Sequence, residues 1–383
     1  MSSSIIHVIL SLLLVLYRPY AVAVSAGQAP GCYKRLFSFG DSITDTGNLG
    51  IVNPNISALA FPYGETFFHR PTGRCSDGRL IVDFIAEELR LPFLKPFLAG
   101  KTVEDFRHGA NFAVAGATAL SQQFFGDMGL DVSGIPPFSL DVECFKRVLH
   151  MLGPTEQERK EIMSSSLFLM GEIGGNDYNH PFFQNRSFRA DIKPLVPKVI
   201  EKIENAIKVL LGLGAKTIVV PGNFPIGCVP TYLTLFQSNN PSDYDAFGCI
   251  RWLNDFAEEH NRALQLMLKR IVPRNDPTVT VVYGDYYGSV LEITRSPQKH
   301  GFRKDAVLTA CCGDCGRHMP GNATSVHLCN DPSKHISWDG LHFTEAAYKF
   351  VARGILDGPY ARVVHPIQMQ ILPKPFSQLH YEA

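Results

Sequence analysis

The sequence predicts an α/β protein in which helices cover both faces of a mostly parallel sheet. Five short apolar runs, rich in β-branched or aromatic residues, recur along the chain, and segments of helical periodicity separate them. Such runs are typical of parallel strands that are buried on both faces. Because strands and helices alternate and crossover connections are right-handed, a doubly wound arrangement is expected. The candidate strands are residues 36–39, 111–114, 167–170, 217–220 and 279–283.

Three further segments have the apolar spacing of amphipathic helices. Residues 80–91 and 199–211 repeat apolar side chains every three or four positions, and residues 252–271 form a third candidate. Gly212 and Gly214 end the second helix. Ligands of doubly wound folds bind at the carboxyl ends of the strands, so a functional site is expected in the loops that follow them.

The composition is that of a globular chain with a large core. Of 383 residues, 45% are hydrophobic and 19% are charged. Lys plus Arg equals Asp plus Glu at 36 each, and no block of like charge marks a surface for nucleic acid or anionic membranes. We therefore expect a small or neutral partner and no nucleic acid.

Long loops rich in Gly, Pro and aromatic residues are expected to form the walls of the site. The longest are residues 53–78, 124–137 and 233–248. No repeat or linker divides the chain, so residues 27–383 are expected to form a single domain.

The first 26 residues have the pattern of a secretory signal peptide. An apolar run at residues 5–16 precedes a small-residue stretch, residues 21–26, which offers Ala-x-Ala-like cleavage sites. The apolar run is too short to span a bilayer, which needs about 20 residues, and no later segment is apolar for long enough. We expect a protein without a transmembrane segment, secreted outside the cell or into the lumen of the secretory pathway.

Cysteines and glycosylation sequons fit an oxidising compartment. The chain has nine cysteines, and Asn55, Asn185 and Asn322 each begin an Asn-x-Ser/Thr sequon. An odd number of cysteines leaves at least one thiol unpaired, and Cys75 is a candidate for it. The pairing itself does not follow from the sequence.

A serine directly follows the first candidate strand. The segment from Gly40 to Ser42 carries the strand into a turn, at the place where ligands bind. Gly40 permits a tight turn, and a helix that starts just after Ser42 would direct free backbone N–H groups toward an oxyanion. Taken alone, the motif also fits a serine that merely caps a helix.

Asp339 and His342 form a second chemical motif near the carboxyl end of the chain. Their spacing of three residues places both on one turn. A serine nucleophile needs a base, and histidine supplies one near neutral pH when an acid fixes its tautomer. The alternative is a buried histidine that is simply hydrogen-bonded to a neighbouring aspartate.

Two middle segments place further donors at strand ends. Gly116 closes the segment that contains the second candidate strand, and Asn176 follows the third strand at an equivalent position. Gly116 offers a backbone N–H that can be approached closely, and Asn176 offers a side-chain N–H. Each also has a simpler interpretation as a turn residue.

Together these four blocks resemble those of the SGNH, or GDSL-type, esterases and lipases, which supply Ser, Gly, Asn and Asp-x-x-His in this order. The resemblance implies that Ser42 is the nucleophile, His342 its base and Asp339 the acid, with the oxyanion held by the Ser42 backbone N–H, Gly116 and Asn176. It also implies a flavodoxin-like, three-layer α/β/α fold with a mostly parallel five-stranded sheet and no metal.

Further segments, residues 63–79, 221–228 and 310–313, are similar to the plant branch of this family. Within that branch the chain is most similar to the group that includes sinapine and acetylajmalan esterases. The resemblance implies an acetyl, phenolic or longer acyl ester, carried by a small molecule or a polymer, and hydrolysis through an acyl-serine intermediate. The alternatives are an acyltransferase of the same fold and a catalytically silent binding protein.

A zinc site is the alternative from another class. Four cysteines and two histidines near the carboxyl end have a spacing similar to that of zinc ligands. Because luminal cysteines oxidise, we instead expect a disulfide from the first or second of these cysteines to the last, and another between Cys228 and Cys249. Cys315 remains without an assignment. The candidate zinc ligands are Cys311, Cys312, Cys315, His318, His327 and Cys329.

Other ligand sites are not expected. Asp41, Asp45 and Asn48 are polar residues beside the start of a predicted helix, and we expect them to cap it rather than to bind calcium. The glycine-rich segments 171–175 and 212–214 do not have the spacing of a dinucleotide-binding fingerprint. No cofactor is therefore expected.

Overall fold

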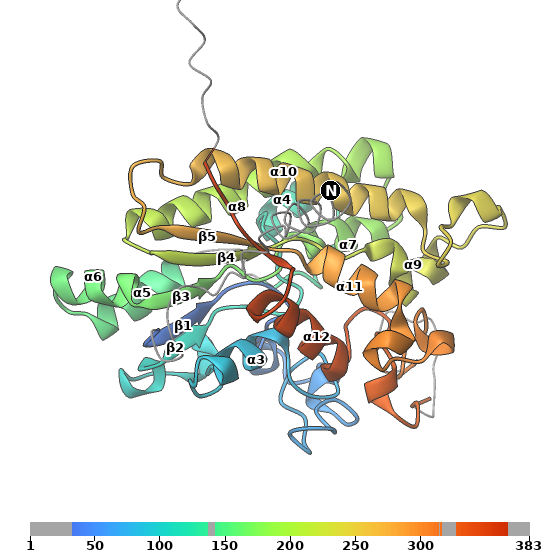
Figure 1. Ribbon diagram of the computed structural model, residues 1–383, viewed down its shortest axis with the longest axis horizontal. Coiled ribbons are helices and arrows are strands. Elements are labelled where there is room, and N and C mark those ends of the chain that lie inside the picture. The colour runs from blue at the N-terminus through green and yellow to red at the C-terminus, as the bar shows by residue number, and fades with distance from the viewer. Residues whose placement is uncertain (1–32, 137–141, 314, 316–326, 367–383) are drawn as a thin grey trace, which may run out of the picture.

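A six-stranded sheet forms the centre of the molecule in the computed structural model, which describes residues 33–136, 142–313, 315 and 327–366. The predicted signal peptide lies outside the described residues. The strand order is β2-β1-β3-β4-β5-β6 (Figure 1). The strands are β1 Arg35–Ser38, β2 Gly109–Asn111, β3 Ser166–Leu169, β4 Thr217–Pro221, β5 Thr280–Gly284 and β6 Ala361–Val363.

The predicted fold class is confirmed, and the sheet has one strand more than predicted. The first five strands pair in parallel, whereas β6 pairs with β5 in the antiparallel direction. Strand β6 is only three residues long and is not fully buried, so it lacks the long apolar run by which the other strands were recognised.

The second strand also starts and ends earlier than predicted. Strand β2 ends at Asn111 rather than Val114. The Asn111 side chain is fully buried and donates to the carbonyl of Thr44, while its oxygen accepts the N–H of Ala113 at 2.8 Å. These hydrogen bonds turn the chain away from the sheet and toward the loop that follows β1.

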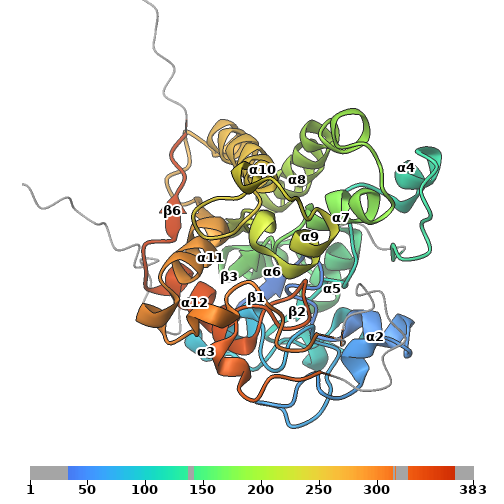
Figure 2. The ribbon, with the colours of Figure 1, turned by 90° about the vertical axis from the view of Figure 1, so that its right-hand side faces the viewer.

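Helices cover both faces of the sheet (Figures 1 and 2). Side chains alternate between the faces because successive residues of a strand point in opposite directions. In β1, Phe37 packs in the cluster that includes side chains of α8 (Leu195–Gly212) and α10 (Arg251–Ile271), whereas Leu36 packs in the cluster with α3 (Ile81–Glu88) and α12 (Glu345–Leu356). The α-helices are α2 Asn48–Val52, α3 Ile81–Glu88, α4 Gln122–Asp127, α5 Glu143–Leu152, α6 Glu156–Ser164, α7 Gly175–Phe183, α8 Leu195–Gly212, α9 Pro230–Leu235, α10 Arg251–Ile271, α11 Tyr286–Arg295 and α12 Glu345–Leu356.

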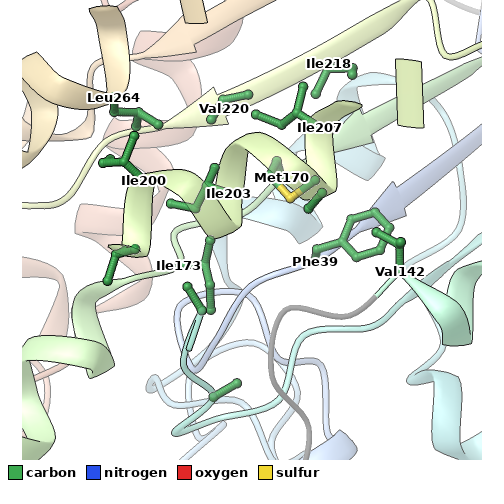
Figure 3. Packing of buried hydrophobic residues seen from close by; sticks show 14 of the residues in the cluster. Phe39, Val142, Met170, Ile173, Ile200, Ile203, Ile207, Ile218, Val220 and Leu264 are labelled. Atoms are coloured by element: carbon green, nitrogen blue, oxygen red, sulfur yellow. The ribbon is translucent and has the colours of Figure 1, made fainter. Parts of the chain in front are cut away.

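Helix α8 shows how the apolar spacing of the sequence fixes the packing. Ile200, Ile203 and Ile207 lie on one face of this helix and point toward Ile218 and Val220 of β4 (Figure 3). All five side chains are buried. Each such side chain contributes about 1.5–3 kcal/mol when it is removed from water, so this stripe holds the helix on the sheet.

A long loop segment, residues 56–79, lies over the carboxyl edge of the sheet, and we call it the strap. Its main anchor is Arg74, which donates from Nε and Nη2 to the two carboxylate oxygens of Asp83 in α3, both at 2.8 Å. The two side chains are only 7% and 0% exposed. At the carboxyl end of the strap, Arg79 donates to Glu345 at the start of α12 at 2.8 Å.

Three disulfides lie among the described residues. Cys228 bonds to Cys249, as predicted, and Cys311 bonds to Cys329, one of the two predicted alternatives. Cys315, which the sequence left without an assignment, bonds to Cys312. The zinc interpretation is therefore wrong, because sulfur atoms bonded to one another are not available as thiolate ligands. The described free cysteines are Cys75 and Cys144.

Within the described ranges, none of the helices is both long enough and apolar enough to cross a bilayer.

Replacing Arg74 by Met is expected to lower the free energy of unfolding by about 3–5 kcal/mol, because the Asp83 carboxylate stays buried without its counter-charge. Urea unfolding followed by circular dichroism measures the change. Lys34→Met is the matched control, because Lys34 pairs with Glu161 at the surface, with side chains 61% and 63% exposed. An Arg74→Met protein as stable as this control would contradict the structural role of the pair.

Candidate active site

The carboxyl edge of the sheet brings together the four predicted blocks. Ser42 follows β1, Gly116 follows β2, and Asn176 lies in the first turn of α7, after β3. Asp339 and His342 lie just before α12. Neighbouring parallel strands end at the same edge of a sheet, which is why residues so far apart in sequence meet here.

The turn that carries Ser42 depends on Gly40. Gly40 has a φ of 135°, and a Cβ atom there would lie 2.6 Å from the hydroxyl oxygen of Thr44 and 2.9 Å from the Glu172 carbonyl oxygen. The expected helix after Ser42 is not formed. Residues 41–45 instead make one turn, closed by the Asp45 N–H donating to the Asp41 carbonyl at 2.9 Å, and α2 begins only at Asn48.

The polar residues beside Ser42 bind backbone groups, as predicted for residues that open a helix. One carboxylate oxygen of Asp45 accepts the N–H groups of Gly47 and Asn48, at 2.7 and 2.6 Å. The other accepts those of Leu49 and Ala115, at 3.0 and 2.8 Å. Asp45 thereby joins the loop after β1 to the loop after β2.

Ser42, His342 and Asp339 form a continuous hydrogen-bonded series. The Nδ1 atom of His342 lies 2.7 Å from Asp339 Oδ2, and its Nε2 atom lies 2.8 Å from the Ser42 hydroxyl oxygen. A carboxylate only accepts, so Nδ1 carries the proton and Nε2 is left to accept the serine hydroxyl. All three residues are at most 8% exposed.

A closed turn fixes Asp339 relative to His342. The Oδ1 atom of Asp339 accepts the backbone N–H groups of Leu341 and His342, at 3.0 and 2.8 Å. Trp338 closes the turn by donating its N–H to the His342 carbonyl at 2.7 Å. Gly340 takes a φ of 92°, which a residue with a side chain rarely adopts.

Three potential donors to an oxyanion surround Ser42. Within the described part of the chain, neither the Ser42 nor the Gly116 backbone N–H donates a hydrogen bond. The Asn176 side-chain amide donates to Asp41 Oδ2 at 3.0 Å and to the Ala117 carbonyl at 3.1 Å. Its oxygen accepts from the side chain of Asn179 at 3.1 Å, which fixes the orientation of the amide.

Two cavities open on Ser42 and share His342 and Asn176 as lining residues. The larger has a volume of about 270 Å³ and is lined mainly by apolar side chains, with Gly116 also on its wall. The smaller has a volume of about 50 Å³ and is lined by Glu172 together with aromatic rings. The strap contributes Ile56, Ser57, Ala58, Tyr63 and Cys75 to the larger cavity.

Two buried carboxyl groups lie in the smaller cavity beside the predicted nucleophile. Asp41 and Glu172 are 2% and 5% exposed. Burial raises the pKa of both groups, and the charge of Asp41 raises the pKa of Glu172 further. The side-chain hydrogen bond between the two groups lowers the pKa of Asp41 and raises that of Glu172, so the pair holds one proton at neutral pH and Glu172 carries it.

The electrostatic environment of His342 favours the imidazolium. Burial, the largest single effect, lowers the pKa of His342, but the charge and hydrogen bond of Asp339, together with neighbouring Cys75, outweigh burial and raise that pKa well above 6.5. For Asp339, burial raises the pKa, but the imidazole and the hydrogen bonds that the carboxylate accepts outweigh burial, and the net pKa is lowered. The imidazole is thus able to accept a proton from Ser42.

Several residues of this site were not predicted from the sequence to belong to it. Tyr63 donates its hydroxyl to Asp339 Oδ2 at 2.8 Å, across 276 positions of sequence. Cys75 lies on the wall of the larger cavity and Glu172 on that of the smaller. The segment of residues 63–79 was recognised only as a block similar to plant relatives, and a contact over so long a separation leaves no local pattern.

Two of the predicted glycosylation residues, Asn55 and Asn185, are exposed at the surface. Asn322 lies outside the described residues.

The fold and the site define a class of protein. A parallel α/β sheet that carries a hydrogen-bonded Ser–His–Asp series at its carboxyl edge is the arrangement of hydrolases that act on acyl groups.

Comparison with known proteins identifies the family. A family model of GDSL-like lipases and acylhydrolases matches residues 36–355. The chain is 46% identical to a sinapine esterase of Brassica napus, and the match covers 94% of each chain. It is 45% identical to a GDSL esterase/lipase of Arabidopsis thaliana, over 92% of this chain and 91% of the relative. The chain belongs to the GDSL-like lipase/acylhydrolase family and is an enzyme that hydrolyses ester bonds.

Histidine titration tests the electrostatics of the site. We expect His342 to titrate above 6.5, because Asp339 stabilises its cation. His260, whose pKa burial lowers to about 3, stays neutral throughout the range from pH 4 upward. NMR of protein with labelled histidine measures both, and the spectrum of His342→Gln assigns the resonance. A midpoint for His342 at or below that of free histidine would contradict this account of the site.

Proposed function

We propose that the protein cleaves an acyl ester through a covalent acyl-Ser42 intermediate. The observation that supports this most directly is the 2.8 Å contact between the Ser42 hydroxyl and His342 Nε2. The other ring nitrogen, Nδ1, is hydrogen-bonded to Asp339 Oδ2. A serine hydroxyl is a weak nucleophile until a base removes its proton, and these contacts supply that base in the required tautomer.

The acylation step follows from these positions. The Ser42 oxygen attacks the ester carbonyl carbon while its proton passes to His342 Nε2. The carbonyl oxygen becomes an oxyanion, which the N–H groups of Ser42 and Gly116 stabilise together with the Asn176 amide, once that amide releases its hydrogen bond to Asp41 or to the Ala117 carbonyl. The bond to the leaving alcohol then breaks, and His342 returns the proton to the alcohol oxygen.

In deacylation, water takes the place of the Ser42 hydroxyl as the nucleophile. His342 removes a proton from water, which attacks the acyl carbon, and the carboxylic acid leaves as the Ser42 oxygen regains a proton. The same intermediate would serve an acyltransferase if an alcohol replaced the water. We propose hydrolysis because the relatives compared above are named esterases.

The larger cavity supports an acyl ester of moderate size as substrate. Its walls are mainly apolar, and its volume of about 270 Å³ is too large for an acetyl group alone. One relative acts on sinapine, as its name states. We propose that this cavity takes the bulkier part of a plant acyl ester and that the smaller cavity takes the part on the opposite side of the carbonyl.

We further propose that the enzyme is secreted and glycosylated. Three disulfides among the described residues require an oxidising compartment for their formation. The exposure of Asn55 and Asn185 supports glycans at these two sequons.

Ser42→Ala is expected to abolish hydrolysis of p-nitrophenyl acetate, butyrate and palmitate and to prevent labelling by a fluorophosphonate, which reacts with an activated serine. Ser242→Ala, at an exposed turn, is the matched control and should keep both. A chelator should leave the wild-type rate unchanged. Full labelling or turnover in Ser42→Ala would refute Ser42 as the nucleophile.

Asn176→Ala is expected to lower kcat by roughly a hundredfold to a thousandfold with little change in KM, because an oxyanion donor acts mainly in the transition state. Steady-state kinetics on p-nitrophenyl butyrate measures both constants. Asn240→Ala, at an exposed position, controls for the loss of an amide. An Asn176→Ala enzyme with the wild-type kcat would rule out this donor.

A further inference from the structure

Tyr63 makes a contact with the proposed catalytic acid that the four family blocks do not contain. Its hydroxyl donates to Asp339 Oδ2 at 2.8 Å, and the same oxygen accepts the Nδ1–H of His342 at 2.7 Å. Tyr63 is 3% exposed, so this hydrogen bond forms away from water. Hydrogen bonds to a charged group are among the stronger ones in proteins.

The contact completes the set of donors around the carboxylate. Asp339 Oδ1 accepts two backbone N–H groups, and Oδ2 accepts from Tyr63 and His342. An ionised carboxylate has about four acceptor sites, so all of them are used. Without the Tyr63 hydroxyl, Oδ2 would keep a single donor, His342, and the rotation of the carboxylate would be less restricted.

The position of Tyr63 is fixed by the strap. Its ring packs edge-on against Trp338, the residue before Asp339, with centroids 5.9 Å apart. The next residue, Gly64, donates its N–H to the Ser76 carbonyl at 3.0 Å, which links both sides of the strap. The Arg74–Asp83 pair then joins the strap to α3. Tyr63 is therefore held at both its ring and its backbone.

We propose that Tyr63 is a positioning residue of the ester hydrolase. It holds the Asp339 carboxylate in the orientation that His342 requires and moderates the basicity of the imidazole by sharing the charge of Oδ2. This proposal rests on the proposed function, in which Asp339 and His342 activate Ser42.

The pH dependence follows from the groups that face this pair. They are Tyr63 and Cys75 from the strap, Asp41 beside Ser42, and Tyr348 of α12. Burial, and then the charge of Asp339, raise the pKa of Tyr63, so its hydroxyl stays protonated and remains a donor. Removing that donor concentrates charge on Asp339, which stabilises the imidazolium. The neutral base then forms only at higher pH.

Tyr63→Phe tests the proposal because it keeps the ring and removes only the hydroxyl. We expect kcat for p-nitrophenyl butyrate to fall about tenfold with little change in KM, and the acid limb of the pH profile to move to higher pH. The rate of fluorophosphonate labelling, measured against pH, gives the same limb without depending on the ester. Tyr178→Phe is the matched control, since its buried hydroxyl lies 2.7 Å from His260 Nδ1.

A double-mutant cycle separates action through Asp339 from a general effect on the fold. In an Asp339→Ala background, Tyr63→Phe should cause no further loss of activity. Difluorotyrosine at position 63 keeps the shape and is a stronger donor, so it should move the limb in the opposite direction even if Tyr63→Phe folds poorly.

The outcomes distinguish this proposal from the proposed function. Wild-type protein that neither hydrolyses esters nor labels at Ser42 would refute the proposed function. Wild-type activity that Ser42→Ala abolishes, together with an unchanged pH limb in folded Tyr63→Phe, would refute the role of Tyr63 alone. Equal shifts in Tyr63→Phe and Tyr178→Phe would also refute it.

Discussion

The hydrogen bond between His342 Nε2 and the Ser42 hydroxyl joins the two ends of the fold, and the geometry of the site depends on it. Ser42 follows β1 and His342 precedes α12, 300 positions later. Their 2.8 Å contact requires that the sheet, α12 and the connecting loops all be in place. The site is therefore a product of the complete fold. Ser42 lies at the strand edge, and Asp339 and His342 lie on a turn whose own residues are joined by several hydrogen bonds, which restricts the movement of all three side chains.

The site also contains several buried carboxyl groups, whose charges must be stabilised by hydrogen bonds or removed by protonation. Asp339 is ionised although it is buried, because four donors, the imidazole among them, stabilise its charge. Glu172, on the other side of Ser42, accepts the backbone N–H of Gly175, and burial together with the charge of Asp41 raises its pKa, so that it keeps its proton. Buried carboxyl groups of one site thus differ in charge state according to their surroundings and hydrogen-bond partners.

Sequence patterns predicted those features that depend on local spacing. The apolar runs gave the five parallel strands, and the order of Ser, Gly, Asn and Asp-x-x-His gave the residues that meet at the sheet edge. Strand β6 was missed because three residues carry no periodic signal, and the helix expected after Ser42 is replaced by one turn because Asp45 binds the N–H groups that start α2. Tyr63 was not predicted, since its contact with Asp339 is set only by the path of the strap.

The strap lines the larger cavity, and its Tyr63 also donates a hydrogen bond to the carboxylate of Asp339. Its residues are therefore not equally free to change during evolution. Ile56 and Ala58 line the cavity with apolar side chains, and changes there are expected to alter which ester fits. Tyr63 and Arg74, in contrast, form hydrogen bonds with Asp339 and with Asp83 of α3. In such an enzyme, substitutions that change substrate specificity are expected in the short stretches between the residues that hold the strap. A new specificity then requires only a few substitutions within this loop and not the replacement of the whole loop.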